Sequence, residues 1–179
     1  MTQIQIEIKG LQKQQKRMEQ IVTDLHGEPM LDGMRKATLL VQRSAKINAP
    51  VDTGRLRASI TPEVRAAGTT VQGVVGSNVV YAPFVELGTK AHFPPLSAIA
   101  AWVRHKGLAG SYSIKTHRRV GSKASQAGQD LAVAFLIARA ISRRGTKAVK
   151  YLERALTENR ERIVRYIGEA VTSIIRSNS

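Results

Sequence analysis

The sequence predicts an α+β fold: a small, mainly antiparallel sheet packed with an N-terminal helical hairpin and a long C-terminal helix, plus an inserted helix-loop-helix segment. Apolar residues recur at helical spacing near both ends of the chain, whereas the middle carries short apolar runs joined by glycine-containing links. With 179 residues, of which 42% are hydrophobic, the chain can bury one sizeable core. We therefore expect a single domain over residues 1–179.

The first fifty residues predict one strand and two helices. Gln3–Lys9 places isoleucine at every second position, which is typical of a strand with one buried face. Leu11–Leu25 and about Leu31–Ile47 carry apolar residues at helical spacing, and glycine and proline between them indicate a break. Pro50 ends the second helix, because a residue that precedes proline avoids helical angles.

Three short strands are predicted next, over Ser59–Val64, Thr69–Val75 and Val79–Leu87. The links between them are only a few residues long and contain glycine. Links this short join antiparallel neighbours, so the three runs predict a small meander.

The second half predicts helices around a loop. Proline at the first turn opens a helix that Gly107 closes, and residues 107–129 hold eight Gly or Ser residues, four Lys or Arg and no acid. We expect this segment to be a mobile basic loop, carrying Lys115, Arg118, Arg119 and Lys123, within an insertion spanning 94–144. Asp130 is the expected N-cap of a helix over Leu131–Ser142. A last helix is expected over Lys147–Ile175.

Composition limits the classes of function. Lys and Arg number 28 against 13 Asp and Glu, and this net charge of +15 favours polyanionic partners. Aromatic residues make up only 4% of the chain, which argues against recognition of stacked bases more than against phosphate contact. There is no cysteine, and the longest apolar run, Leu131–Ala138, is far too short to span a membrane. We expect a soluble, unexported protein without disulfides.

No pattern indicates catalysis, a metal site or a cofactor. The four histidines, His26, His92, His105 and His117, are scattered without ligand spacing. Neither a nucleophile motif nor a phosphate-binding glycine loop is present. Glu86 is the one acid between Glu63 and Asp130, and an ion pair with Arg55 or Arg57 is favoured over a role as a base. Trp102 is expected in the core or an interface.

The sequence of Ala49–Ile60 predicts a defined turn between a helix and a strand. Pro50 stops the preceding helix, and the side chains of Asp52 and Thr53 can bond nearby backbone amides. Gly54 can take a positive φ, after which Arg55 and Arg57 are exposed as the chain enters the first strand of the meander. A second segment, Tyr81–Thr89, has Pro83 inside an expected strand, which indicates an edge position where another subunit can add.

These two segments resemble the tail-completion, or head-to-tail joining, proteins of long-tailed bacteriophages, the gene-product-ten type of the lambdoid group. The signature A-P-V-D-T-G-x-L-x-x-S-I is matched by Ala49–Ile60, and Y-A-x-x-x-E-x-G-T by Tyr81, Ala82, Glu86, Gly88 and Thr89. The motif residues taken as the assembly interface are Asp52, Thr53, Gly54, Arg55, Arg57, Tyr81, Pro83, Glu86, Gly88 and Thr89.

The resemblance implies a structural subunit and no enzyme. It implies a hexameric ring in the neck or proximal tail of the virion, assembled in the host cytoplasm, between a head connector or stopper protein and a tail tube or terminator protein. No membrane is involved, and contact with DNA in the lumen is left open. A tail terminator would belong to the same class. The rival interpretation is a nucleic-acid-binding protein of a mobile element, although no helix-turn-helix or stacking surface is evident.

Overall fold

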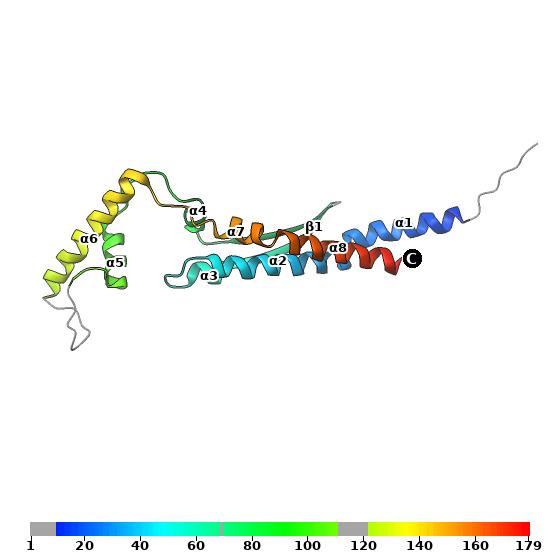
Figure 1. Ribbon diagram of the computed structural model, residues 1–179, viewed down its shortest axis with the longest axis horizontal. Coiled ribbons are helices and arrows are strands. Elements are labelled where there is room, and N and C mark those ends of the chain that lie inside the picture. The colour runs from blue at the N-terminus through cyan, green and yellow to red at the C-terminus, as the bar shows by residue number, and fades with distance from the viewer. Residues whose placement is uncertain (1–9, 69, 111–121) are drawn as a thin grey trace, which may run out of the picture. The chain divides into compact units, whose positions relative to one another are not determined.

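The computed structural model describes residues 10–68, 70–110 and 122–179, and these form an α+β fold, as predicted (Figure 1). The elements are α1 (Leu11–His26), α2 (Glu28–Asn48), α3 (Arg55–Ser59), β1 (Ile60–Ala67), β2 (Thr70–Ser77), α4 (Ala82–Leu87), α5 (Leu96–Lys106), α6 (Lys123–Arg144), α7 (Tyr151–Glu158) and α8 (Arg160–Ser177). They form two compact units. Unit 1 is the chain up to Ala82 together with Lys150–Ser179, and unit 2 is Pro83–Val149.

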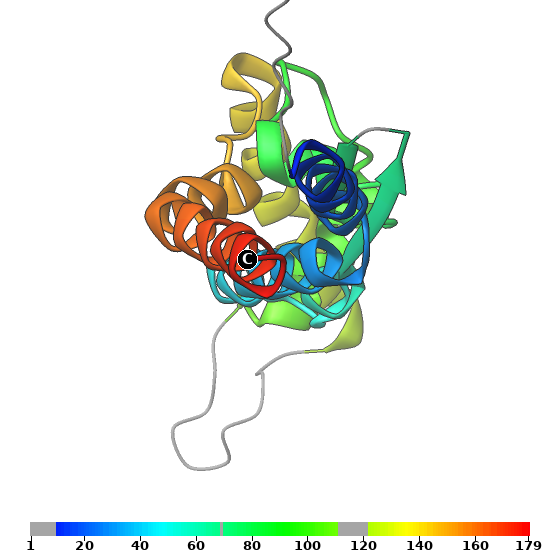
Figure 2. The same cartoon turned by 90° about the vertical axis from the view of Figure 1, so that its right-hand side faces the viewer.

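Helix α2 is the centre of unit 1. It packs against β1 and β2 on one side and against α7 and α8 on another, and α1 contacts both α2 and α8 (Figures 1 and 2). Its buried positions, among them Ala37, Val41 and Ala45, recur at helical spacing and form the stripe that the sequence predicts. The predicted N-terminal pair of helices and the C-terminal helical region are therefore confirmed.

Small residues let the layers of unit 1 approach closely. A Cβ added at Gly33 of α2 would lie 2.6 Å from the Cβ of Ala170 in α8. A Cβ added at Gly73 of β2 would lie 2.5 Å from Cγ2 of Thr38 in α2. Neither contact leaves room for a methyl group, so glycine at these positions sets the distance between the layers.

The sheet has two strands in the described part of the chain, so the predicted three-stranded meander is wrong. Strands β1 and β2 pair antiparallel from Ile60 opposite Ser77 to Ala67 opposite Thr70. The third predicted strand, Val79–Leu87, is instead helical over Ala82–Leu87. Pro83 accounts for the difference, because proline is well suited to the first turn of a helix. The predicted strand Gln3–Lys9 lies outside the described residues, as does Thr69.

The first boundary of α2 also differs from the prediction. Only Gly27 separates α1 from α2, and Pro29 lies within the first turn of α2 rather than breaking the chain before it. Glu28 in that turn is hydrogen-bonded and ion-paired with Arg35, about two turns further on, and this contact lowers the pKa of the Glu28 carboxyl.

The predicted continuous helix Lys147–Ile175 is wrong at two places. The backbone of Val149 donates to the carbonyl of Val85 over 3.0 Å, so the chain before α7 is extended alongside α4 instead of helical. Asn159 then separates α7 from α8, with its side-chain amide donating to the carbonyl of Ala155 over 2.8 Å. An asparagine that bonds the preceding turn in this way competes with the regular helical ladder.

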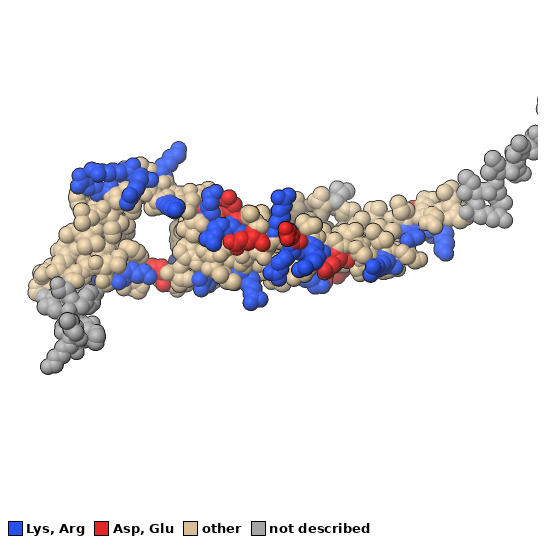
Figure 3. Space-filling model, in the orientation of Figure 1, with Lys and Arg blue, Asp and Glu red and all other residues tan. Residues whose placement is uncertain are grey.

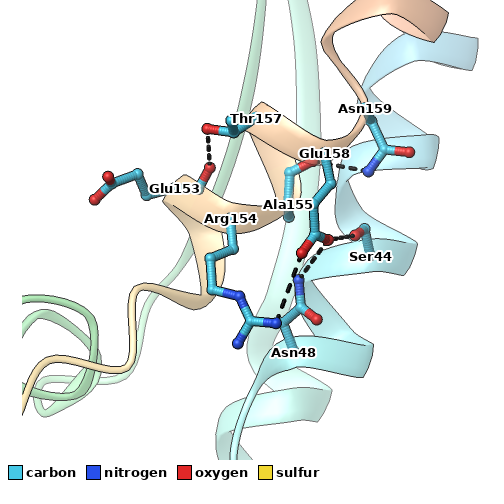
Figure 4. A network of polar contacts seen from close by, with 8 residues as sticks. All are labelled: Ser44, Asn48, Glu153, Arg154, Ala155, Thr157, Glu158 and Asn159. Carbon is cyan, nitrogen blue, oxygen red and sulfur yellow. Dashed lines mark hydrogen bonds and ion pairs between the residues drawn. The ribbon is translucent and has the colours of Figure 1, made fainter.

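Polar contacts fix α7 to α2 beside this break (Figure 4). The carboxylate of Glu158 accepts from Nδ2 of Asn48 over 3.2 Å and from Oγ of Ser44 over 3.5 Å. It also lies 3.6 Å from the guanidinium of Arg154 within α7. Glu158 therefore links α7 to α2 and also pairs with a cation of its own helix.

Unit 2 contains an antiparallel pair of helices, α5 and α6, with a small apolar core. The buried residues of this core are Ala100, Val103, Ala109 and Ala134, and Ile99, Val133 and Ile137 pack against them. Asp130 is buried in the middle of α6, where it accepts from Nε of Arg104 over 3.1 Å. The predicted N-cap role of Asp130 is wrong: Ser122 caps α6 by accepting from the amide of Ser125 over 3.2 Å.

The predicted end of the basic loop falls within α6. Lys123 begins α6, so residues 123–129 are helical and the predicted end of the loop at residue 129 is wrong. Lys115, Arg118 and Arg119 lie outside the described residues. The predicted insertion, 94–144, falls inside unit 2, and the assignment of residues 1–179 to a single domain stays a prediction.

Candidate assembly interface

The first motif forms a turn that joins α2 to the sheet. Three of its apolar side chains, those of Ala49, Leu56 and Ile60, are buried, whereas that of Val51 is 51% exposed. The amide of Ala49 donates to the carbonyl of Ala45 over 2.9 Å at the end of α2. Gly54 has the predicted positive φ, +83°, and precedes the short helix α3. The signature therefore has a structural explanation, because its buried apolar positions and its glycine hold the turn in place.

The rest of this turn points outward. Asp52, Thr53, Arg55 and Arg57 are exposed, which agrees with the predicted exposure of the two arginines. The guanidinium of Arg57 donates to the carbonyl of Ala49 over 3.3 Å, so this exposed arginine also stabilises the turn. The N-cap of α3 is Gly54, which has no side chain, and the predicted bonds of Asp52 and Thr53 to backbone amides stay a prediction.

We expect Gly54→Ala to lower the free energy of unfolding by about 1–2 kcal/mol, because holding an L-residue in the left-handed conformation costs roughly that much. A Cβ at Gly54 would meet no atom within 4 Å, so the cost is conformational and not steric. Urea unfolding followed by circular dichroism measures it. Gly76→Ala is the control, since that glycine also has open space but no positive φ; equal stability of both variants would contradict the explanation.

The second motif does not form the predicted edge strand. Tyr81 is exposed and Ala82 is buried in unit 1, whereas Pro83, Glu86, Gly88 and Thr89 belong to unit 2 and lie in or just after α4. Its exposed apolar side chains are those of Phe84, 57% exposed, and Leu87, 73% exposed, which are three residues apart and share a helical face. The sequence interpretation missed both. Their spacing of three residues directly after Pro83 is the sequence feature that would have indicated a shared helical face.

These side chains line an open groove of about 540 Å³, which we call the α4 groove. It is formed by Pro83, Phe84, Leu87, Gly88, Thr89, Lys90, Ala91 and His92, and its surface is mainly apolar. Phe93 follows at once and lies 6.4 Å from Phe135 of α6, ring centre to ring centre. An open apolar groove with few polar groups is suited to a protein side chain and offers little for chemistry on a substrate.

A tight joint of two glycines supports the α4 groove. Thr89 and Thr146 exchange backbone hydrogen bonds of 3.1 and 3.3 Å, and their hydroxyls lie 2.9 Å apart. Gly88 and Gly145, the residues just before them, both have positive φ, and a Cβ at either would meet the opposite backbone at 2.4 and 1.9 Å respectively. The glycine and threonine of the second motif are thus explained by this close approach.

The other predicted site residues divide between the two units. Arg55 and Arg57 belong to unit 1 and Glu86 to unit 2, so the predicted ion pair of Glu86 stays a prediction. Trp102 is 39% exposed on α5. Lys123 is exposed at the start of α6.

The described residues give no candidate for a metal centre or a membrane span. No three His, Cys, Asp or Glu side chains among them are grouped so as to hold a metal ion, and His117 lies outside them. None of the described helices is long and apolar enough to cross a membrane.

One comparison with known proteins gives a match. The model of a family described as "Bacteriophage HK97-gp10, putative tail-component" matches residues 12–88, which run from α1 to the end of α4 and include both motifs up to Gly88. No curated protein and no solved structure matches the chain. The resemblance predicted from the two motifs is confirmed over residues 12–88, where the chain is similar to the HK97-gp10-like family.

Proposed function

We propose that this chain is a structural virion-assembly subunit that forms a ring at the head–tail interface of a long-tailed phage or prophage, as a tail-completion or neck protein. The observation that carries the proposal is the exposed apolar surface of the α4 groove, at the end of the segment that matches a family of phage tail components. Both the family and the groove favour protein docking over catalysis.

The α4 groove supplies the contact that a ring needs. Burying a side chain such as Phe84 or Leu87 stabilises an interface by about 1.5–3 kcal/mol each, whereas leaving them in water stabilises nothing. A surface of one subunit that receives a different surface of the next forms a head-to-tail contact, and repetition of that contact closes a ring when the rotation allows it. We propose six copies in the ring, with the head connector or stopper on one side and the tail tube or terminator on the other.

The location follows from the same proposal. The subunit is made in the host cytoplasm and ends in the virion, in the neck or proximal tail, with no enzymatic role. A tail terminator that caps the tube is the alternative within the same class. A nucleic-acid-binding protein of a mobile element is the alternative outside it, favoured by 11 Lys and Arg against two Asp and Glu in unit 2.

The test uses a phage in which the gene is replaced by Phe84→Ser/Leu87→Ser. We expect the variant protein to fold, because both side chains are exposed, but to enter particles poorly and to lower the yield of infectious phage by more than about 100-fold, since two interface anchors are lost. Leu156→Ser/Val164→Ser is the control, with side chains 56% and 64% exposed on α7 and α8. Normal yields from the groove variant would refute the proposed contact.

A further inference from the structure

A row of positive side chains follows the C-terminal end of α6 in unit 2. Five exposed cations belong to it, and we call them the α6 basic edge: Lys90, Arg139, Arg143, Arg144 and Lys147. Figure 3 shows Lys and Arg gathered over this end of α6, with no Asp or Glu among them on that face. We propose that the α6 basic edge binds the phosphate backbone of duplex DNA without reading its sequence.

The backbone brings the five residues together from two segments. The paired threonines Thr89 and Thr146 hold Lys90 against Gly145, where an added Cβ would lie 2.8 Å from the carbonyl carbon of Lys90. The contact of Phe93 with Phe135 holds the continuation of the same segment against α6 two turns earlier. The segment that carries Lys90 therefore runs along the part of α6 that carries the arginines.

The charges of the edge are not neutralised within the protein. No ion pair joins any of the five side chains to an acid in the described part of the chain, whereas Arg104, a nearby member of unit 2, is paired with Asp130. The helix macrodipole favours cations at the last turn, which accounts for Arg143 and Arg144 but not for the other three. Five like charges held together repel one another, and a polyanion offsets that repulsion.

The edge fits DNA better than it fits an acidic protein surface. Arg139 and Arg143 are one helical turn apart, about 6 Å along the axis, and duplex DNA offers a phosphate about every 3.4 Å along each strand, so this spacing is close to that of every second phosphate. A protein partner would be anchored by the apolar side chains beside the edge, Leu136 of α6 and those of the α4 groove that Lys90 borders, and not by the five cations. The scarcity of aromatic residues argues against stacking as the main source of affinity and favours backbone contact.

The contact does not depend on the proposed place in the neck, although that place would put the edge near DNA leaving the head. The experiment uses the purified full-length chain and a fluorescent 30-base-pair duplex of mixed sequence, with affinity measured by anisotropy between 50 and 200 mM KCl. If all five cations contact phosphates, the logarithm of the affinity should fall with the logarithm of salt with a slope of about −4 to −5 from the edge alone, which is a loss on the order of 500-fold over this range.

The test variant replaces all five edge residues by glutamine: Lys90→Gln, Arg139→Gln, Arg143→Gln, Arg144→Gln and Lys147→Gln. The control variant removes the same charges from exposed positions of unit 1: Lys13→Gln, Lys16→Gln, Arg43→Gln, Arg160→Gln and Arg162→Gln. Both lose two Lys and three Arg, so their net charges are equal. We expect the edge variant to lose most of its DNA affinity and about four units of salt slope, and the control to lose less than about one unit.

Three results would overturn the inference. Equal losses in the two variants would mean that DNA responds to net charge only. An edge variant that still binds DNA but no longer binds poly-L-glutamate would mean that the partner is an acidic protein. Loss of DNA affinity in a variant that replaces the three edge arginines by lysine would point to a structural role, because lysine preserves the charge. Failure of the Phe84→Ser/Leu87→Ser variant in particles leaves the edge intact, so the two proposals can fail separately.

Discussion

Gly145→Ala should unfold unit 2 selectively, at a cost of roughly 3–5 kcal/mol. The residue has φ +69° and ψ −159°, a region that essentially only glycine occupies, and forcing an L-residue into it costs of order 1–3 kcal/mol. The added Cβ would also lie 1.9 Å from the carbonyl oxygen of Thr89, so the pairing of Thr89 with Thr146 must break. Strain and a broken joint together give the larger figure.

Trp102 makes this measurement specific. It is the one tryptophan of the chain and lies on α5 in unit 2, so its fluorescence in urea reports on unit 2, while far-ultraviolet circular dichroism reports on the helices of both units. Gly128→Ala in α6 is the matched control: a Cβ there meets nothing within 4 Å, and alanine should stabilise the helix by about 0.5–1 kcal/mol. A Gly145→Ala protein whose fluorescence midpoint equals that of the native chain would contradict the proposed joint.

Tyr151→Ala should destabilise unit 1 by about 3–5 kcal/mol. Tyr151 is fully buried, at 0% exposure, and is the largest of the fully buried side chains among the described residues. It lies at the start of α7, which packs against α2. Truncation leaves a cavity in a core otherwise built largely of alanine, which has few long side chains able to move into the space.

The control for this cavity is on the same helix. Leu156→Ala removes a side chain that is 56% exposed and should cost well under half as much. Amide hydrogen exchange resolved by peptide distinguishes the units: in Tyr151→Ala the amides of α2, α7 and α8 should exchange faster, whereas those of α5 and α6 should not. Equal acceleration in both units would mean that the two units unfold together.

The sequence predicted the elements that long helical patterns define. α1, α2 and α5 have apolar residues at helical spacing over several turns, and the positive φ at Gly54 follows from its place between Asp52 and α3. Such features depend on local chemistry, which a single sequence contains.

The errors have a common physical origin in contacts between distant residues. Val79–Leu87 was assigned as a strand because a short apolar run fits either a strand or a helix, and only the turn at Pro83 decides between them. Asp130 was assigned as a cap because Arg104, its partner from another helix, is 26 residues away. The extended segment before α7 depends on its pairing with Val85 and Thr89, about 60 residues earlier in the chain, which no local pattern of Lys147–Val149 reveals.

The sequence located the segments of the candidate interface but gave the wrong secondary structure for the second one. The two motifs were identified, and Gly88 and Thr89 prove to lie in the joint with Gly145 and Thr146. The side chains of Phe84 and Leu87, which dominate the α4 groove, were missed because strand periodicity assigns them to different faces, whereas a helix places them on the same one. One wrong choice of period therefore concealed the surface on which the proposed function depends.

The most direct test of the central proposal is electron microscopy of lysates from a phage whose copy of this gene carries an early stop codon. A subunit that joins head to tail is needed only after both have been built. We therefore expect DNA-filled heads and separate tails of normal length, which join when the purified protein is added. Complete, infectious particles in the absence of the protein would contradict the proposed function.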